Sequence, residues 1–312
     1  MPKKKFSVPG SVILLLAALA WGSAFVAQSL GSDSVRPFTF NAARSLLGAL
    51  VLVPVFLTFD RVSPSPNRGN KKTLWIGGAM CGGLLFMACN LQQFAISYVD
   101  TAGKTAEEIL NIEKANIGKV AFLTALYIVL VPAFGVFMKK KAGVQVWLGV
   151  LVALIGMYFL CIKPGFTVST GDIYAFLCAF AFAMQIIVVD EVVERVDPIR
   201  LSCVQFLVCG ILSAIAAAIF DQPALSDVLN AWAPILYMGV VSSGIAYTLQ
   251  ILGQARCKPV VASLVMSMES VFSAIFGYLI LNQAMTTKEF LGCALMLFAV
   301  VLAQFPGRKE KA

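Results

Sequence analysis

The sequence has no histidine, few charged residues and no nucleotide-binding glycine loop. Charged residues make up 13% of its 312 positions, against roughly 25% in a soluble domain. A soluble protein of this length needs far more charge to cover its surface. The eight cysteines include no C-x-x-C pair, which argues against a zinc site and a disulfide framework. We therefore expect no metal, no cofactor and no ATP-hydrolysing site.

What the sequence has instead is a series of long apolar blocks. Apolar residues make up 59% of the chain, and about 20 of them in a row cross the ~30 Å hydrocarbon core of a bilayer. The pattern predicts an all-α membrane protein with ten transmembrane helices, surrounded by lipid. The predicted spans are residues 10–30, 37–59, 74–97, 120–138, 143–162, 172–189, 198–219, 232–253, 259–281 and 289–305.

The net charge of +8 is distributed as in a membrane protein and not as in a nucleic-acid-binding one. If both termini lie in the cytoplasm, 17 of the 24 Lys and Arg residues face the cytoplasm and six face outside, while Arg44 lies within a span. Cytoplasmic loops of membrane proteins carry such an excess of basic residues. The sequence therefore predicts cytoplasmic N- and C-termini and no nucleic-acid partner.

The chain also contains an internal repeat. The stretch from Pro37 to Arg44 matches residues 198–205 at an offset of 161, Leu91-Gln92 matches residues 249–250 at 158, and Phe134-Gly135 matches residues 276–277 at 142. Each half then holds five spans, and because five is odd the second half enters the membrane from the opposite side. Such inverted repeats recur in secondary transporters, whose substrates bind near the midplane. We expect a first repeat over residues 1–165 and a second over 166–312.

The fall in offset from 158 to 142 places roughly fifteen extra residues between the third and fourth spans of the first half. They correspond to residues 105–119, a polar segment that we expect on the outer side. It is either a tolerated loop insertion or a lid that gates the outer opening.

Three stretches of the sequence resemble a known family. They are Ala20-Trp21-Gly22-Ser23, the run from Phe122 to Pro132 and the run from Met266 to Gly277. Together with the two five-span halves, they resemble the drug/metabolite transporter superfamily, and specifically its bacterial ten-span EamA branch, over about residues 10–305. The resemblance implies a monomeric or weakly dimeric carrier in the bacterial inner membrane that exports amino acids or related small metabolites by alternating access. It also implies a cavity lined by the first, third and fourth spans of each half.

Two charged residues lie well within the predicted spans, Arg44 and Glu269. A charge there costs at least ~2.5–3.5 kcal/mol on insertion scales, so each needs a partner, water or a function. Glu269 is interpreted either as a cation site or proton carrier, or as a hydrogen-bonded group that joins helices. Arg44 is interpreted either as a functional group or as a polar helix contact. If both line one cavity, a zwitterionic amino acid suits them, with its ammonium beside Glu269 and its carboxylate beside Arg44; if they pair with each other, that argument disappears.

Further candidates are polar or aromatic side chains within spans. The offset of 142 aligns Tyr127 with Glu269, and Trp21, at mid-span, either stacks on a substrate or only packs. Amides and hydroxyls in hydrocarbon either bond across helices or line a wet path. Those singled out are Asn90, Gln92, Gln93, Gln185, Tyr247 and Gln250.

We therefore expect a secondary transporter that exports small metabolites, with amino acids as the first choice. Its transport is either coupled to protons or runs as exchange or facilitated diffusion. Alternatives within transport are an importer of a vitamin- or nucleoside-like compound and an exporter of cationic drugs. An alternative of another class is a non-transporting membrane protein or an intramembrane enzyme. An enzyme would need a catalytic cluster at the midplane, where the sequence offers one carboxylate, so we expect no enzymatic activity.

Overall fold

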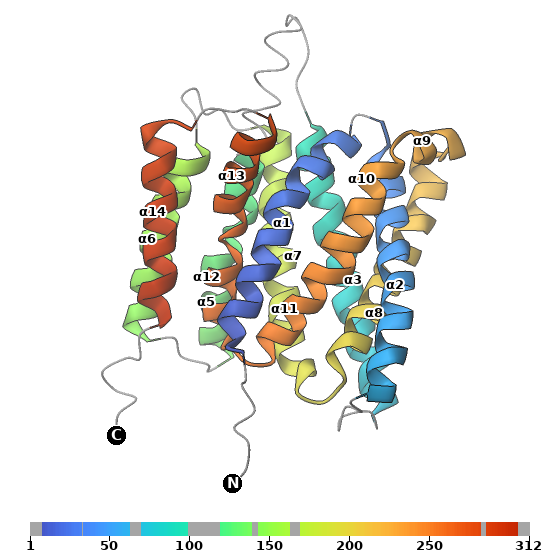
Figure 1. Ribbon diagram of the computed structural model, residues 1–312, viewed down its shortest axis with the longest axis horizontal. Helices are drawn as coiled ribbons and strands as arrows, with labels where there is room; N and C mark the ends of the chain where they lie inside the picture. The colour runs from blue at the N-terminus through green and yellow to red at the C-terminus, as the bar shows by residue number, and fades with distance from the viewer. Residues whose placement is uncertain are drawn as a thin grey trace, which may run out of the picture.

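The computed structural model describes residues 8–32, 34–62, 70–98, 119–138, 143–162, 169–281 and 285–304. Within these ranges the regular structure is helical, and the helices stand side by side in one bundle (Figure 1). Nine helices of this part of the chain are long and apolar enough to cross a membrane. The first predicted span is also a helix, α1 (Gly10–Ser32), whose apolar part Gly10–Phe25 is shorter. The chain is therefore a multi-pass membrane protein.

The helices fall close to the predicted spans. In the first half they are α1, α2 (Pro37–Val62), α3 (Lys71–Ser97), a span Lys119–Phe137 that ends in α5 (Tyr127–Phe137), and α6 (Val144–Cys161). In the second half they are α7 (Thr170–Val193), α8 (Pro198–Ala216), the π-helical η1 (Ala217–Asp221), the short α9 (Leu225–Asn230), α10 (Trp232–Tyr237), the π-helical η2 (Met238–Ala246), α11 (Tyr247–Gln254), α12 (Pro259–Met266), α13 (Glu269–Leu281) and α14 (Thr287–Gln304).

Local signals fix where several helices of the second half begin. At the start of α7, Ser169 and Asp172 form a reciprocal capping box. At the start of α8, the Asp197 side chain accepts a hydrogen bond from the Arg200 backbone N–H at 3.0 Å, and Pro198 follows as the first helical residue. These caps satisfy backbone donors that have no partner within the helix. Between the caps, apolar helices satisfy their own backbone, as hydrocarbon requires.

Most of the larger helix contacts join the two halves. α6 packs along α14 at one edge of the bundle and α2 along α8 at the other, while α1 and α7 lie in the middle (Figure 1). The contact of α3 with α7 has a counterpart in that of α11 with α1, and the contact of α3 with α8 has one in that of η2 with α2. Several of the larger contacts of one half thus have a counterpart in the other.

Two spans are interrupted near their middle, which the sequence analysis did not predict. The helix is broken at Ala125-Leu126 in one and at Ser267-Met268 in the other, again at an offset of 142. The tighter backbone hydrogen bonds across the two breaks also correspond. They are Leu126 N to Leu123 O (3.2 Å) and Ile128 N to Ala125 O (3.0 Å) in the first half, and Met268 N to Val265 O (3.2 Å) and Ser270 N to Ser267 O (3.2 Å) in the second.

The two ends of the bundle carry different parts of the chain. The start of α1 and the end of α14 lie at the same end, and α9 lies at the opposite one (Figure 1). At that opposite end, Lys119 forms an ion pair of 2.6 Å with Asp172, which joins a span of the first half to α7 of the second. Of the predicted insertion 105–119, residues 105–118 lie outside the described part of the chain.

Glycines allow α3 to lie close to its neighbours. A Cβ atom at Gly82 would stand 2.6 Å from the Gln205 backbone oxygen and 2.7 Å from the Val208 Cβ, whereas one at Gly83 would meet nothing within 4 Å. Small residues at such contacts are the usual means by which membrane helices approach each other.

We predict that Gly82→Ala destabilises the protein by about 1–3 kcal/mol, because the added methyl group forces α3 and α8 apart. Thermal unfolding of the purified protein in detergent micelles measures the effect. Gly83→Ala is the matched control and should unfold at the temperature of the parent chain. Equal unfolding temperatures for the two variants would contradict the close α3–α8 contact.

Candidate functional site

A small cavity lies in the centre of the bundle, between the two halves. Its walls come from the first, third and fourth spans of each half, as expected, and in addition from α2. The lining residues are Trp21, Ala24, Phe25, Gln28, Arg44, Gln92 and Tyr127 from the first half, and Phe182, Gln185, Ile186, Met238, Ser242, Tyr247, Gln250, Met266 and Glu269 from the second.

Eight of the ten candidate residues from the sequence line this cavity. They are Trp21, Arg44, Gln92, Tyr127, Gln185, Tyr247, Gln250 and Glu269. The structure thus brings together side chains that are up to 248 positions apart in the sequence. The other two candidates, Asn90 and Gln93, are buried behind the lining residues.

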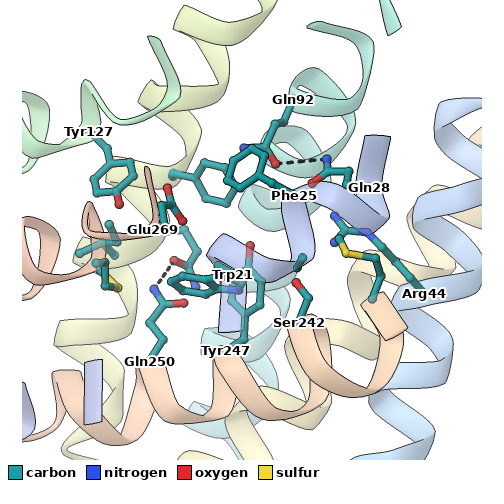
Figure 2. A pocket seen from close by; sticks show the side chains of 16 residues that line it. Trp21, Phe25, Gln28, Arg44, Gln92, Tyr127, Ser242, Tyr247, Gln250 and Glu269 are labelled. Atoms are coloured by element: carbon teal, nitrogen blue, oxygen red, sulfur yellow. Dashed lines mark hydrogen bonds between the residues drawn. The ribbon is translucent and has the colours of Figure 1, made fainter. Parts of the chain in front are cut away.

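Glu269 and Tyr127 reach the cavity from the interrupted spans. Each is the first residue of the helix that follows the break, α13 and α5 respectively. Their side chains point toward the same space on one side of the cavity (Figure 2). Glu269 is 9% exposed and Tyr127 4%. The two residues that the offset of 142 aligns are therefore also close in space, with the hydroxyl and the carboxyl group facing the same part of the cavity.

Arg44 lies on the other side of the cavity, beyond Trp21 and Tyr247 (Figure 2). Its side chain is 3% exposed, and its Nε donates to the Asn41 Oδ1 at 2.6 Å. Within the described ranges, neither Arg44 nor Glu269 has an opposite charge within 4.0 Å, so they do not pair with each other. The cavity holds both charges separately.

An aromatic wall stands between the two charged groups. The Trp21 and Tyr247 rings meet edge to face with centroids 4.7 Å apart, and Phe206 packs on the other side of Tyr247 at 5.1 Å. The Trp21 indole N–H is buried and has no acceptor among the residues that the structure describes. Trp21 thus packs on Tyr247 and also faces the cavity, and its stacking on a substrate stays a prediction.

Glutamine side chains form a hydrogen-bonded row in the second half. Gln250 Nε2 donates to Gln185 Oε1 at 3.1 Å, and Gln185 Nε2 donates to Gln205 Oε1 at 3.2 Å. The Gln250 Oε1 is buried without a donor in the described part of the chain. These amides join α7, α8 and α11, and two of them, Gln185 and Gln250, also face the cavity.

A smaller group of amides occupies the first half. Gln28 Nε2 donates to Gln93 Oε1 at 3.0 Å and to Gln92 Oε1 at 3.4 Å (Figure 2 shows the bond to Gln92). Gln28 and Gln92 line the cavity, while Gln93 supports them from behind. Of the two interpretations of Gln93, the contact between helices is the one that the structure shows.

Asn90 also joins helices. Its Oδ1 accepts from Asn41 Nδ2 at 3.0 Å, and its own Nδ2 donates to the Phe86 backbone oxygen at 2.8 Å and to Ser213 Oγ at 3.2 Å. Asn90 therefore connects α2, α3 and α8 and does not line the cavity itself.

Several residues of the site were not predicted from the sequence, and of these Gln28, Asn41 and Ser242 are polar. Asn41 precedes Arg44 by three positions, the spacing at which side chains meet on a helix, so the pattern could have identified it. Gln28 is a polar residue near the end of an apolar span, which the composition alone does not separate from a loop-facing amide. Ser242 lies in the π-helical η2, where the face of a residue does not follow the α-helical period.

The chemistry that this arrangement allows is binding. One guanidinium and one carboxyl group face a small cavity with an aromatic wall and amide donors and acceptors, as ligand sites commonly do. Within the residues that the structure describes, no group of three His, Cys, Asp or Glu side chains could hold a metal ion.

Comparison with known proteins gives one family match. The model of the EamA-like transporter family matches residues 8–106 and 169–305. Similar proteins include one named an uncharacterized transporter in Archaeoglobus fulgidus, 27% identical over 93% of this chain and 83% of its own length. Another is the uncharacterized transporter YoaV of Bacillus subtilis, 20% identical over 96% of this chain and 97% of its own. A WAT1-related chloroplastic protein of Arabidopsis thaliana is 24% identical over 94% and 69%.

A solved crystal structure shares the fold. It superposes with a TM-score of 0.76 over 97% of this chain and 99% of the other, with 19% sequence identity. At this identity the likeness shows the arrangement of the helices alone.

Proposed function

Because the chain belongs to the EamA-like transporter family, we propose that it is a secondary carrier that exports small metabolites, amino acids or related compounds, across the bacterial inner membrane. The observation that carries this proposal is the central cavity, which lies between the halves and faces one carboxyl and one guanidinium group that do not pair. In secondary transporters with repeated halves, substrate and coupling ions bind near the midplane between the repeats.

Alternating access is supported by the way the halves pack. Helix contacts of one half have counterparts in the other, and the two interrupted spans break at equivalent positions beside the cavity. An inverted repeat with units at residues 1–165 and 166–312 accounts for both observations. The cavity then opens to one side or the other as one half rocks against its counterpart.

Glu269 is the proposed coupling group. A carboxyl group in a low-dielectric site can exchange between its charged and neutral forms, and so carry a proton or bind a cation. The hydroxyl of its neighbour, Tyr127, points toward the same part of the cavity. The substrate and the coupling ion then compete for one carboxylate.

Transport itself is tested with the purified protein in liposomes. We predict that neutral amino acids exchange across the proteoliposome membrane faster than across protein-free liposomes. The panel includes labelled amino acids, nucleosides and quaternary amines, each with and without a pH gradient. Flux of nucleosides or of quaternary amines alone would replace amino acids by one of those classes, and no flux of any class would refute the carrier.

For Glu269→Gln we predict that a pH gradient no longer accelerates flux, because the amide cannot take up or release a proton. Substrate exchange without a gradient should continue at a reduced rate, because a neutral amide binds the ammonium of the substrate less tightly than a carboxylate does. Flux is measured as a function of the pH gradient. Asp227→Asn, which removes a carboxylate from α9 outside the cavity, is the control and should behave as the parent chain. Unchanged pH dependence in Glu269→Gln would remove the coupling role.

The orientation proposed here places both termini in the cytoplasm, in agreement with the distribution of Lys and Arg. We predict that a membrane-impermeant maleimide labels Ser226→Cys, on the exposed α9, in intact cells. It should label Ala255→Cys, at the other end of the bundle, only after permeabilisation. Labelling of the parent chain gives the background from its native cysteines, and the reverse accessibility would invert the topology.

A further inference from the structure

We infer that Arg44 is the group that binds the carboxylate of the substrate, that Asn41 and Asn90 hold it in position, and that the substrate is a zwitterion bound in one orientation. This inference rests on the proposed transport function and adds the group that binds the substrate carboxylate and the orientation in which the substrate is bound. It assigns to Asn41 a positioning role that is separate from the coupling role of Glu269.

The guanidinium of Arg44 is held in position by hydrogen bonds between side chains. Arg44 Nε donates to Asn41 Oδ1 at 2.6 Å, and Asn41 Nδ2 donates both to Asn90 Oδ1 at 3.0 Å and to the Cys89 backbone oxygen at 3.2 Å. These partners fix which end of the Asn41 amide faces Arg44. Asn90 is in turn held by Ser213 Oγ at 3.2 Å. The guanidinium is thus oriented by a row of two amides and one hydroxyl that begins on α2 and ends on α8.

Some hydrogen-bond donors of the Arg44 guanidinium remain available to a ligand. Its Nε is used by Asn41, and the guanidinium lies beside the Cys89 thiol, a weak acceptor. In the described part of the chain its remaining N–H groups find no oxygen acceptor, although the side chain is buried and lines the cavity. A buried charge without a partner is costly. A planar carboxylate in the cavity is the ligand whose geometry a guanidinium matches.

The position equivalent to Arg44 in the second half carries no charge. At the offsets of the repeat, Asn41 corresponds to Ser202 and Asn90 to Thr248. Thr248 Oγ1 donates to Ser202 Oγ at 3.0 Å, so the contact between the two helices is kept. Arg44, however, corresponds to Gln205, a neutral amide that accepts from Gln185. The second half thus keeps the hydrogen bond between the two helices, but it has neither the charge nor a counterpart of the bond from Arg44 to Asn41.

The opposite asymmetry applies to the carboxyl group. Glu269 of the second half corresponds to Tyr127 of the first, at the equivalent helix break. The positive charge therefore lies only in the first half and the negative charge only in the second, on opposite sides of the aromatic wall (Figure 2). A zwitterion matches this arrangement in one orientation, with its carboxylate at Arg44 and its ammonium at Glu269. The reverse orientation brings like charges together.

The experiment measures binding of matched probes to the full-length purified protein. The probes are leucine, leucinamide, which lacks the carboxylate, and 4-methylpentanoate, which lacks the amine. Dissociation constants come from ligand-induced thermal stabilisation. We expect the parent chain to bind leucine at least about tenfold more tightly than leucinamide, the factor that a charged hydrogen bond supplies. In Arg44→Gln we expect leucine and leucinamide to bind equally.

Two further variants separate a binding role from a structural one. Asn41→Ser, which copies the second half, should keep the fold and reduce the preference for leucine over leucinamide severalfold without abolishing it. Arg36→Gln removes an exposed arginine that contacts the Phe220 backbone oxygen, and it should leave the preference unchanged. The double variant Arg44→Gln/Gln205→Arg moves the charge to the equivalent position and should lower leucine affinity without unfolding the protein.

The outcomes distinguish this inference from the proposed function. Equal binding of leucine and leucinamide by the parent chain, or an unchanged ratio in Arg44→Gln, overturns the carboxylate site. Flux of quaternary amines together with no binding of any of the three probes overturns it as well, while transport stands. Loss of the unfolding transition in Arg44→Gln shifts the decision to Asn41→Ser, in which an unchanged ratio overturns the assignment.

Discussion

A charged side chain in the middle of a membrane protein loses its hydration and must recover that free energy from partners, and the centre of this bundle is arranged around two such groups. Arg44 belongs to the first half and Glu269 to the second. Both side chains are buried, and they do not form an ion pair with each other. The Asn41 amide accepts a hydrogen bond from Arg44, and the Tyr127 hydroxyl lies beside Glu269. Each charged group therefore has a fixed position and no opposite charge beside it. A charged ligand can then pair with it.

The packing around the cavity explains how this arrangement is maintained. Glycines such as Gly82 let α3 approach α8 closely, and Gly156 and Gly292 do the same for α6 and α14 at the edge of the bundle. Close contacts of this kind exclude lipid and fix the spacing of the helices without polar groups. The amides of Gln185 and Asn90 are then free to connect helices near the centre. The apolar periphery and the polar centre thus have separate tasks.

Much of this was accessible from the sequence, because lipid enforces a strong pattern of long apolar blocks. The helical, multi-pass character and the family were predicted correctly. Tyr127, Glu269 and Arg44, which were singled out from the repeat and from their charge, all line the cavity, with Arg44 on the opposite side from the other two. The distinction between lining and supporting residues was not accessible. Gln92 and Gln93 are neighbours of the same residue type, and the turn of the helix alone decides that one faces the cavity and the other does not. Neither helix break contains a proline or a glycine, the residues from which a break in a helix is usually predicted.

Those breaks, at Ala125-Leu126 and Ser267-Met268, make each of two spans a pair of short rods joined by a bend point. A continuous helix transmits displacement along its whole length, whereas a short stretch of tighter turn is where a helix bends most easily. Tyr127 and Glu269 begin the rods directly after these bend points. Because both side chains lie beside a bend point, a small change of backbone angle there would shift the far end of the following helix by a larger distance than it shifts the side chain at the cavity.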